Sequence, residues 1–183
     1  MGQIITISGT IGSGKSTVAK MLAQKLGWQY YSTGLAHRKI AEEMGITTIE
    51  LNSLANKDKS IDNRIDAIFK NPPWGNDNCV VDSRLAFHFI PDSFKVCLIV
   101  QPEEAGRRIF TGSERSGEHK YASVQEATKT AIERHELEVM RFQRNYHVNI
   151  EDKSNFDLII DTTHLQVEQT CQKILATLDK IKA

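Results

Sequence analysis

Short apolar runs alternate with longer amphipathic stretches along the whole chain. The runs at 4–7, 79–81, 96–100 and 156–160 are rich in Ile, Val, Leu and Cys, which is typical of strands buried on both faces of a parallel sheet. A shorter run at 28–31 predicts one more strand. Because helical patterns separate the runs, we expect βαβ units and an α/β, three-layer αβα domain. Its sheet would be parallel and five-stranded, with helices on both faces.

Helices are predicted between the strands, where apolar side chains recur every three or four residues. The first follows the strand at 4–7 and ends at Gly27, and the last covers 167–178. Residues 34–70 are predicted to be helical, with a break at Gly45. One domain therefore accounts for all 183 residues.

Two capping boxes mark helix starts inside the longer segments. Glu50 follows Thr47 by three residues, and Glu126 follows Ser123 in the same way. The second box begins a long helix, whose apolar residues at helical spacing are Ile132, Val139, Phe142 and Tyr146. Before this helix, residues 111–121 contain Gly and Ser among charged residues and predict a short lid.

The clearest motif lies between the first strand and the first helix and matches G-x-x-x-x-G-K-[ST]. It consists of Gly9, Thr10, Ile11, Gly12, Ser13, Gly14, Lys15 and Ser16, followed by Thr17. In such a loop, backbone N–H groups and a helix N-terminus bind phosphate oxygens. Lys15 supplies a cation for the β- and γ-phosphates, and the Ser16 hydroxyl can ligate Mg²⁺. The alternative is a glycine-rich turn with a solvated lysine. Because the fixed positions of this motif occur by chance in about one chain of this length in a hundred, we expect a site for ATP or a similar nucleotide.

Residues that follow other strands are candidates for the same site, because ligands of parallel sheets bind beyond the carboxyl ends of the strands. Asp82 ends one strand, and we interpret it as a partner of Mg²⁺, the alternative being a cap of the next helix. After the strand at 28–31, Ser32 or Thr33 is expected to cap a helix that carries Arg38.

Arginines suggest a second anion near the phosphate loop. Arg38 and Arg84 both lie shortly after strands, and the planar guanidinium suits a bidentate grip on phosphate. Further arginines occur around the lid and on the long helix: Arg107, Arg108, Arg115, Arg134, Arg141 and Arg144. They either surround a transferred phosphoryl group or pair with glutamates on solvated helices, namely Glu103, Glu133, Glu136 and Glu138. Phosphoryl transfer needs several cations, which favours the first interpretation for the set.

Composition narrows the class of protein without naming a ligand. The 23 basic and 23 acidic residues give a net charge of zero, so nothing indicates nucleic acid or an acidic membrane as partner.

We interpret Cys79, Cys97 and Cys171 as buried thiols in a reducing compartment, which favours the cytoplasm. No apolar stretch predicts a membrane span. An N-terminal match to the myristoylation pattern overlaps the first strand, and we prefer the strand. The six histidines show no metal-ligand spacing, and we expect structural or surface roles for them. The oligomeric state stays open, and a monomer is compatible with the sequence.

These motifs resemble those of nucleoside-monophosphate kinases, and most closely the compact archaeal type of cytidylate kinase. The similar segments are 4–17, Ser32-Thr33-Gly34 with Arg38, 80–86, Glu133-Arg134, Arg141-Phe142, Asn145-Tyr146 and 152–162. Three positions depart from the family pattern: Ser83 and His147 stand where a glycine is usual, and Asn149 where an aspartate is usual. The departures bear on which base is accepted.

The resemblance implies Mg²⁺-dependent transfer of the ATP γ-phosphoryl group to CMP or dCMP. By this analogy Thr33, Arg38 and Arg84 would hold the monophosphate, and Arg108 would lie against adenine. Arg115, Arg134 and Arg141 would act beside Lys15 as lid and transition-state cations. The segment 34–75 would form the monophosphate-binding region.

Two other functions remain open from sequence. The acceptor could be AMP, UMP or a small non-nucleotide metabolite, although Arg38 and Arg84 favour an acceptor that already carries a phosphate. The loop could also serve a non-catalytic nucleotide-binding module. The many arginines around the γ-phosphate argue against that alternative, because a switch needs fewer cations. Trp74 could cover the acceptor, but we expect it to anchor a loop.

Overall fold

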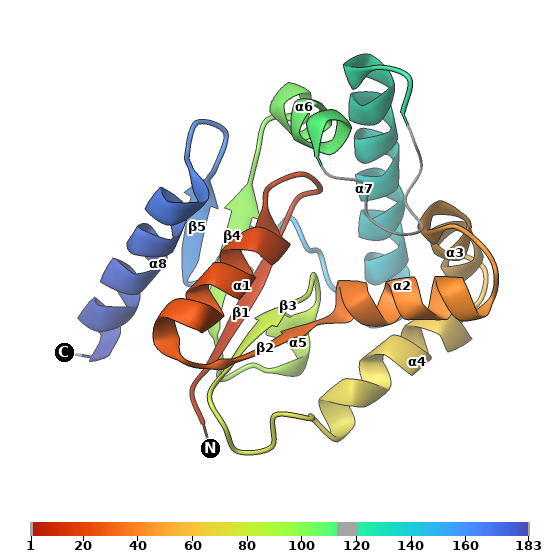
Figure 1. Cartoon of the computed structure of the whole chain (residues 1–183). Helices are drawn as coiled ribbons and strands as arrows, with labels where there is room; N and C mark the ends of the chain where they lie inside the picture. The colour runs from red at the N-terminus through yellow and green to blue at the C-terminus, as the bar shows by residue number, and fades with distance from the viewer. Residues whose placement is uncertain (1, 113–120, 183) are drawn as a thin grey trace.

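The computed structural model describes residues 2–112 and 121–182 and confirms the predicted parallel sheet (Figure 1). Its strands are β1 (Ile4–Gly9), β2 (Gln29–Ser32), β3 (Cys79–Asp82), β4 (Phe94–Ile99) and β5 (Leu158–Asp161). They pair in the order β2-β3-β1-β4-β5, and every neighbouring pair is parallel. All five predicted strands differ from the observed ones by one or two residues at one or both ends, within the usual uncertainty of such boundaries.

Eight helices and one short 3-10 turn surround the sheet in the described residues. They are α1 (Lys15–Leu26), α2 (Thr33–Glu43), α3 (Thr48–Ala55), α4 (Lys59–Lys70), α5 (Ala86–Phe89), α6 (Pro102–Thr111), α7 (Val124–Tyr146), η1 (Lys153–Asn155) and α8 (Val167–Lys182). No helix among them is long and apolar enough to cross a bilayer.

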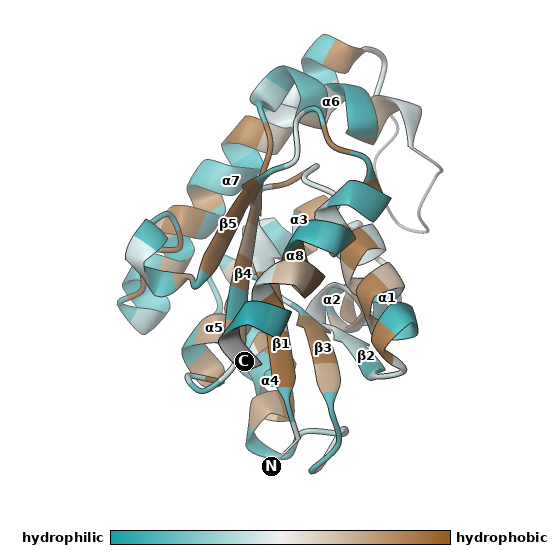
Figure 2. Ribbon diagram, turned by 90° about the vertical axis from the view of Figure 1, so that its left-hand side faces the viewer, coloured by the Kyte–Doolittle hydropathy of each residue, from teal (hydrophilic) through white to brown (hydrophobic). Residues whose placement is uncertain are grey.

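The two faces of the sheet are covered by different helices because strand side chains alternate in direction. Ile5 and Ile7 of β1 are fully buried in a cluster with residues of α1 and α8. Cys79 and Val81 of β3 point the other way and pack with Ala86 of α5. Figure 2 shows the corresponding colours, with hydrophobic strands at the centre and more polar helices outside. The predicted helices on both faces are therefore confirmed.

The segment 34–75 forms a separate lobe beside the carboxyl end of β2 (Figure 1). It contains α2, α3 and α4, which bury a small core of their own around Leu51 and Ile61. Gly45 has φ +66° and ends the first of these helices, as the sequence predicts. The predicted capping box of Thr47 and Glu50 begins the second, with the side chain and the backbone N–H of each residue in reciprocal contact.

Several predictions about single residues can be compared with the structure. The thiols of Cys79, Cys97 and Cys171 are free and buried, as expected. Trp74 is 5% exposed and packs against Tyr31, so it anchors its loop and does not cover a ligand. Ile132 was expected on the apolar face of α7, but it is 41% exposed, because this part of α7 buries Ala127 and Ala131 instead. The other predicted members of that face, Val139, Phe142 and Tyr146, pack in one cluster.

Candidate active site

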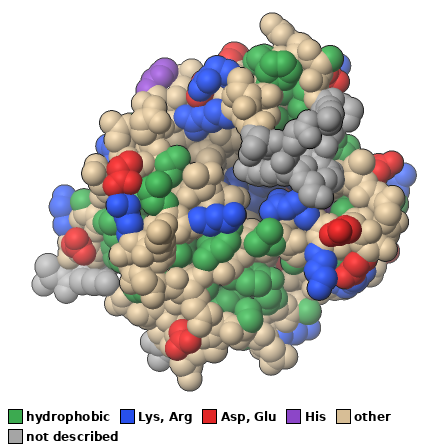
Figure 3. All heavy atoms as spheres, viewed as in Figure 1, with side chains coloured by type: hydrophobic (Ala, Val, Ile, Leu, Met, Phe, Trp, Pro, Cys, Tyr) green, Lys and Arg blue, Asp and Glu red, His purple; other side chains and the backbone are tan. Residues whose placement is uncertain are grey.

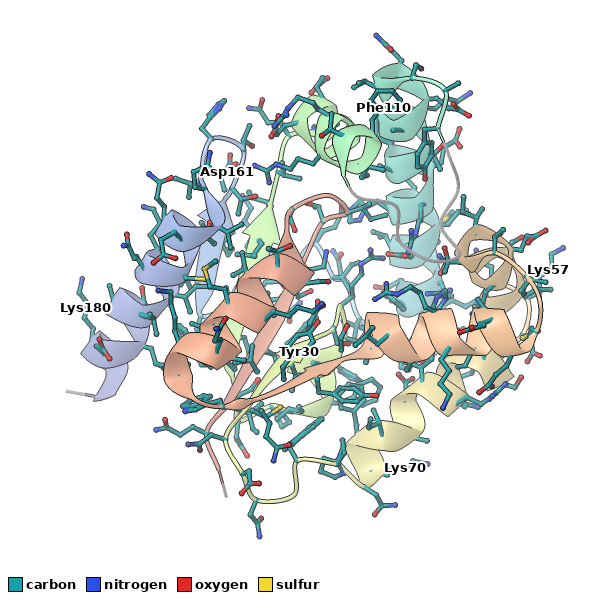
Figure 4. The ribbon with its side chains drawn as sticks, viewed as in Figure 1. Tyr30, Lys57, Lys70, Phe110, Asp161 and Lys180 are labelled. Carbon is teal, nitrogen blue, oxygen red and sulfur yellow. The ribbon has the colours of Figure 1, made fainter. Side chains whose placement is uncertain are left out.

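A cavity of about 780 Å³ opens beyond the carboxyl ends of β1 and β3. Its wall includes the phosphate loop, the start of α1, residues of α2, α3 and α4, the inner faces of α6 and α7, and the segment 162–167. On the face seen in Figure 3, Lys and Arg side chains gather around the hollow at the centre. In Figure 4, side chains of α2, α7 and the loop before α1 point toward the same space. The cavity is large enough for two small ligands side by side.

The phosphate loop adopts the conformation that its glycines allow. Gly12 has φ +78°, and a Cβ there would lie 2.7 Å from Ala105 of α6. Gly14 has φ +84° and caps α1 with no atom within 4 Å of the position of a Cβ. Close packing and the backbone angle therefore both require glycine at position 12. Gly14 leaves open space at the N-terminus of α1.

Hydrogen bonds from hydroxyl groups to backbone carbonyls fix the phosphate loop. Ser13 Oγ donates to the Thr10 carbonyl at 2.9 Å. Thr162 Oγ1, which follows β5, lies 3.1 Å from the Ser13 carbonyl oxygen and 3.0 Å from the Ile99 carbonyl oxygen. Thr162 thus connects the loop with β4 and β5, a role that the sequence did not indicate.

The side chain of Lys15 is held by the backbone of the phosphate loop. Its Nζ donates to the Thr10 carbonyl at 2.7 Å. Burial, together with the positive charges of Arg84 and Arg134, lowers the pKa of Lys15 to about 7. A bound phosphate would supply the missing negative charge, so this lysine is prepared for an anion.

Asp82 lies at the end of β3, one strand away from the loop, and does not cap the following helix. Its Oδ2 accepts hydrogen bonds from Ser32 Oγ at 3.1 Å and Tyr30 Oη at 3.2 Å; Tyr30 is labelled in Figure 4. Ser32 therefore stands before α2 without capping it through its side chain, contrary to our expectation, because its hydroxyl is committed to Asp82. Thr33 is the first residue of α2 rather than its cap.

The oxygen ligands available here fit Mg²⁺. Asp82 is 5% exposed and lines the cavity together with Ser16. One carboxylate and one hydroxyl suffice for an ion that usually keeps several waters and takes phosphate oxygens as its other ligands. No cluster of three or more His, Cys, Asp or Glu that could hold a metal occurs in the part of the chain that the structure describes. A dedicated protein cage for a metal is thus not built from the residues of 2–112 and 121–180.

A buried carboxylate on α7 organises two of the predicted cations. Glu138 is 3% exposed and forms an ion pair with Arg84 and a second one, at 3.4 Å, with Arg134 Nε. The sequence offered Glu138 as a partner of arginines on a solvated helix. The pairing is found, but the solvated position is wrong, because this face of α7 forms part of the cavity wall. Burial and the guanidiniums of Arg134 and Arg141 lower the pKa of Arg84 to about 9, which leaves it charged at neutral pH.

Arg141 lies one turn further along α7 and is 5% exposed. Its Nε lies 3.7 Å from Asp62 Oδ2 of α4, and its Nη1 donates to Asn52 Oδ1 of α3 at 3.5 Å. Both distances are long, and the Nε has no hydrogen-bond partner among the described residues. The guanidinium therefore has unused donor capacity at the cavity wall.

The first turns of α2 bring Thr33, His37 and Arg38 to the cavity. Burial and the surrounding arginines lower the pKa of His37 to about 3, so its imidazole is neutral. Its Nε2 is buried without a partner among the described residues. We expected a structural or surface role for this histidine, and the structure instead places it in the wall of the site. Its position one residue before Arg38, a predicted ligand, is the signal that could have indicated this.

Arg108 marks the opposite end of the cavity. Its guanidinium donates to the Thr162 carbonyl at 2.6 Å, to the Thr163 carbonyl at 3.3 Å and to Glu104 at 2.8 Å. It is therefore held against the segment after β5. Of the other predicted site residues, Arg115 and most of the lid at 111–121 lie outside the described residues. Those that line the cavity are Ile11, Gly12, Ser13, Gly14, Lys15, Ser16, Thr17, Thr33, Arg38, Asp82, Arg84, Arg108, Arg134 and Arg141.

A phosphate loop at the carboxyl end of the central strand of a parallel sheet, facing several buried cations, defines a P-loop phosphotransferase. The model of the cytidylate kinase-like family matches residues 4–164, and the chain belongs to this family. It is thus a nucleotide-binding kinase.

Two relatives named cytidylate kinase agree with this assignment, and a third relative has a different name. The chain is 35% identical over 164 residues to a cytidylate kinase of Natronomonas pharaonis, covering 88% of this chain and 82% of that one. It is 35% identical over 174 residues to a cytidylate kinase of Ignicoccus hospitalis, covering 93% and 96%. It is also 36% identical over 180 residues to an S-adenosylmethionine-dependent nucleotide dehydratase of Lacinutrix mariniflava, covering 98% of this chain. The chain spans only 36% of the length of that dehydratase.

Solved structures share the fold at lower identity. A protein from Eubacterium ventriosum superposes with a TM-score of 0.68 at 19% identity, covering 97% of this chain and 98% of that one. Shikimate kinase from Bacteroides thetaiotaomicron superposes with a TM-score of 0.64 at 16% identity, covering 97% and 98%. These neighbours establish the P-loop kinase fold and leave the acceptor open.

Proposed function

We propose that the protein transfers the γ-phosphoryl group of ATP to a nucleoside monophosphate, with CMP and dCMP as the preferred acceptors. The observation that carries this proposal is the continuity of the cavity. One space runs from the phosphate loop past Lys15 to Arg38, Arg84 and Arg141, and on to α3 and α4. Two anion sites that share one cavity suit a donor triphosphate and an acceptor phosphate that meet end to end. The names of the relatives support cytidylate as the acceptor.

The residues of this chain would act by positioning and by charge. The loop and the N-terminus of α1 bind the β-phosphate, and Lys15 follows the migrating phosphoryl group. Arg84 and Arg134 are held by Glu138 next to that path and neutralise its developing charge. Asp82 and Ser16 would hold Mg²⁺, which would supply positive charge to the terminal phosphates. No covalent enzyme intermediate is needed. Arg108 would flank the adenine of ATP, and Thr33 and Arg38 would bind the acceptor phosphate.

Substitution of Arg38 tests whether this residue binds the acceptor phosphate. The structure shows no ion pair for Arg38 in its described part, and the side chain lines the cavity on the acceptor side. We expect Arg38→Ala to raise the KM for CMP about tenfold to a hundredfold, because a charge-assisted contact is lost. The Kd for ATP should stay within about twofold of wild type. Lys39→Ala, at the exposed neighbouring position, is the matched control. An unchanged KM for CMP in Arg38→Ala would show that Arg38 does not bind the acceptor phosphate.

A further inference from the structure

The carboxylate proposed to hold Mg²⁺ is supported by strand β2, which contributes no residue to the phosphate loop. In the parallel ladder Ser32 of β2 lies opposite Asp82 of β3. Because strand side chains alternate in direction, Tyr30 and Ser32 lie on one face of β2 and the intervening Tyr31 on the other. Tyr30 packs against the core cluster shared with α1 and α8, whereas Tyr31 packs against Trp74. The face of β2 that carries Tyr30 and Ser32 is therefore the one turned toward α1.

Two hydroxyl groups of this face donate to the same oxygen of Asp82. Ser32 Oγ lies 3.1 Å and Tyr30 Oη lies 3.2 Å from Asp82 Oδ2. Ser32 is 2% exposed and Asp82 is 5% exposed, so the contact between them lies away from solvent. An ionised carboxylate can only accept hydrogen bonds, and no hydrogen bond or ion pair with the described residues uses its second oxygen, Oδ1. Since Asp82 lines the cavity, Oδ1 is the oxygen that is left for a ligand.

Tyr30, which is labelled in Figure 4, contacts Asp82 without being one of the residues that line the cavity. Its ring lies beside α1, where Lys20 Nζ is 5.8 Å from the ring centroid, within the range of a cation–π contact. The same helix carries Ser16, the second candidate ligand of Mg²⁺, about one turn before Lys20. Tyr30 therefore contacts one ligand through its hydroxyl and the helix of the other ligand through its ring.

We infer that Tyr30, together with Ser32, is a positioning residue that holds the Asp82 carboxylate with one oxygen directed at Mg²⁺. This inference rests on the proposed function. Contacts behind a metal ligand orient that ligand, and the loss of such a contact lowers metal affinity about tenfold to a hundredfold. Mg²⁺ requires nearly ideal octahedral geometry and keeps several waters. A carboxylate that is fixed to offer one oxygen suits these requirements.

The same two hydrogen bonds bear on the choice of metal. Ca²⁺ takes more oxygen ligands than Mg²⁺, in a more flexible geometry, and often binds both oxygens of a carboxylate. Asp82 Oδ2 already accepts from two hydroxyl groups, so bidentate binding would compete with both hydrogen bonds. Tyr30 and Ser32 thus favour Mg²⁺ over Ca²⁺ at this carboxylate.

The test is a titration with Mn²⁺, a paramagnetic substitute for Mg²⁺, in which electron paramagnetic resonance measures the free ion. The protein is saturated with a non-hydrolysable ATP analogue, and the analogue alone is the reference. We expect Tyr30→Phe to raise the Kd for Mn²⁺ about tenfold, because Asp82 loses one of its two donors. Tyr31→Phe removes a hydroxyl group from the other face of β2 and should keep the wild-type Kd, which makes it the matched control. A Kd in Tyr30→Phe equal to that of wild type would overturn the inference.

Further measurements separate positioning of Asp82 from general damage to the fold. In the presence of EDTA, Tyr30→Phe should bind the ATP analogue within about twofold of wild type. Equal losses of affinity with and without metal would contradict a role through Asp82. The ratio of the Kd for Ca²⁺ to the Kd for Mn²⁺ should fall in Tyr30→Phe, and an unchanged or higher ratio would contradict the effect on metal choice. These titrations need no acceptor, so a wild type that phosphorylates no nucleoside monophosphate would refute the proposed function alone.

Discussion

Lys15 and Arg84 illustrate how single charges are kept ready for a ligand. Both lie in a wall that removes water from them, and both have depressed pKa values. In the ligand-free protein this arrangement costs stability, because buried charges are solvated poorly. Active sites commonly accept such a cost, since a bound phosphate compensates the charges.

The pKa of Lys15 predicts how stability depends on pH. The folded protein holds this lysine with a pKa of about 7, against 10.5 for an unperturbed lysine. Between these values the unfolded chain binds more protons than the folded one, so the contribution of Lys15 to the free energy of unfolding rises with pH. Urea denaturation of wild type and Lys15→Met from pH 6 to pH 10 measures it. The stability of wild type relative to the variant should increase across this range, and a constant difference would contradict the shifted pKa.

The ion pair of Arg84 and Glu138 predicts a stability effect separable from catalysis. Arg84→Ala leaves a buried carboxylate that keeps only the longer contact with Arg134. We expect a loss of about 3 kcal/mol in the free energy of unfolding. In the double variant Arg84→Ala/Glu138→Gln most of this stability should return, since the buried carboxylate is replaced by a neutral amide, whereas the KM for CMP should stay high. Thermal and chemical denaturation would show this, and a double variant as unstable as Arg84→Ala would contradict it.

At the scale of elements, α7 does the most to assemble the site. One helix of residues Val124–Tyr146 supplies Arg134, Glu138 and Arg141 at intervals of three or four residues, so they share one face. Tyr146 at its end reaches α4, which connects the acceptor lobe to the main domain. The orientation of α7 is therefore important for both ligands.

The end of α7 predicts a stabilising substitution. His147 follows the helix with φ +58°, a left-handed conformation that favours glycine. His147→Gly should raise the free energy of unfolding by about 1 kcal/mol without changing kcat. Denaturation by urea would measure the gain. His164→Gly serves as a control at a position without a positive φ, and an equal gain there would argue against the backbone explanation.

The sequence predicts the elements better than the contacts between them. Strands and helices follow from local patterns, and the phosphate loop from eight successive residues. The pairing of Glu138 with Arg84 could not be predicted, because these residues are far apart in the chain and meet only when α7 packs against the end of β3. The same holds for His37, since the sequence does not show that the face of α2 that carries it turns inward.

At the scale of the whole molecule, a chain without net charge concentrates its cations in one cavity. The 23 basic and 23 acidic residues balance, yet Lys15, Arg38, Arg84, Arg108, Arg134 and Arg141 all line the same space. Their local field attracts anionic nucleotides, whereas the balanced surface does not attract polyanions in general. Membership of the cytidylate kinase-like family agrees with this distribution.

The most direct test is a coupled assay of ADP release with ATP and Mg²⁺, comparing CMP, dCMP, UMP, AMP and no acceptor. We predict acceleration by CMP or dCMP well above the other acceptors, and its loss in Lys15→Ala. A rate with every acceptor equal to the rate without one would contradict the central claim that this cavity joins a triphosphate donor to a nucleoside monophosphate.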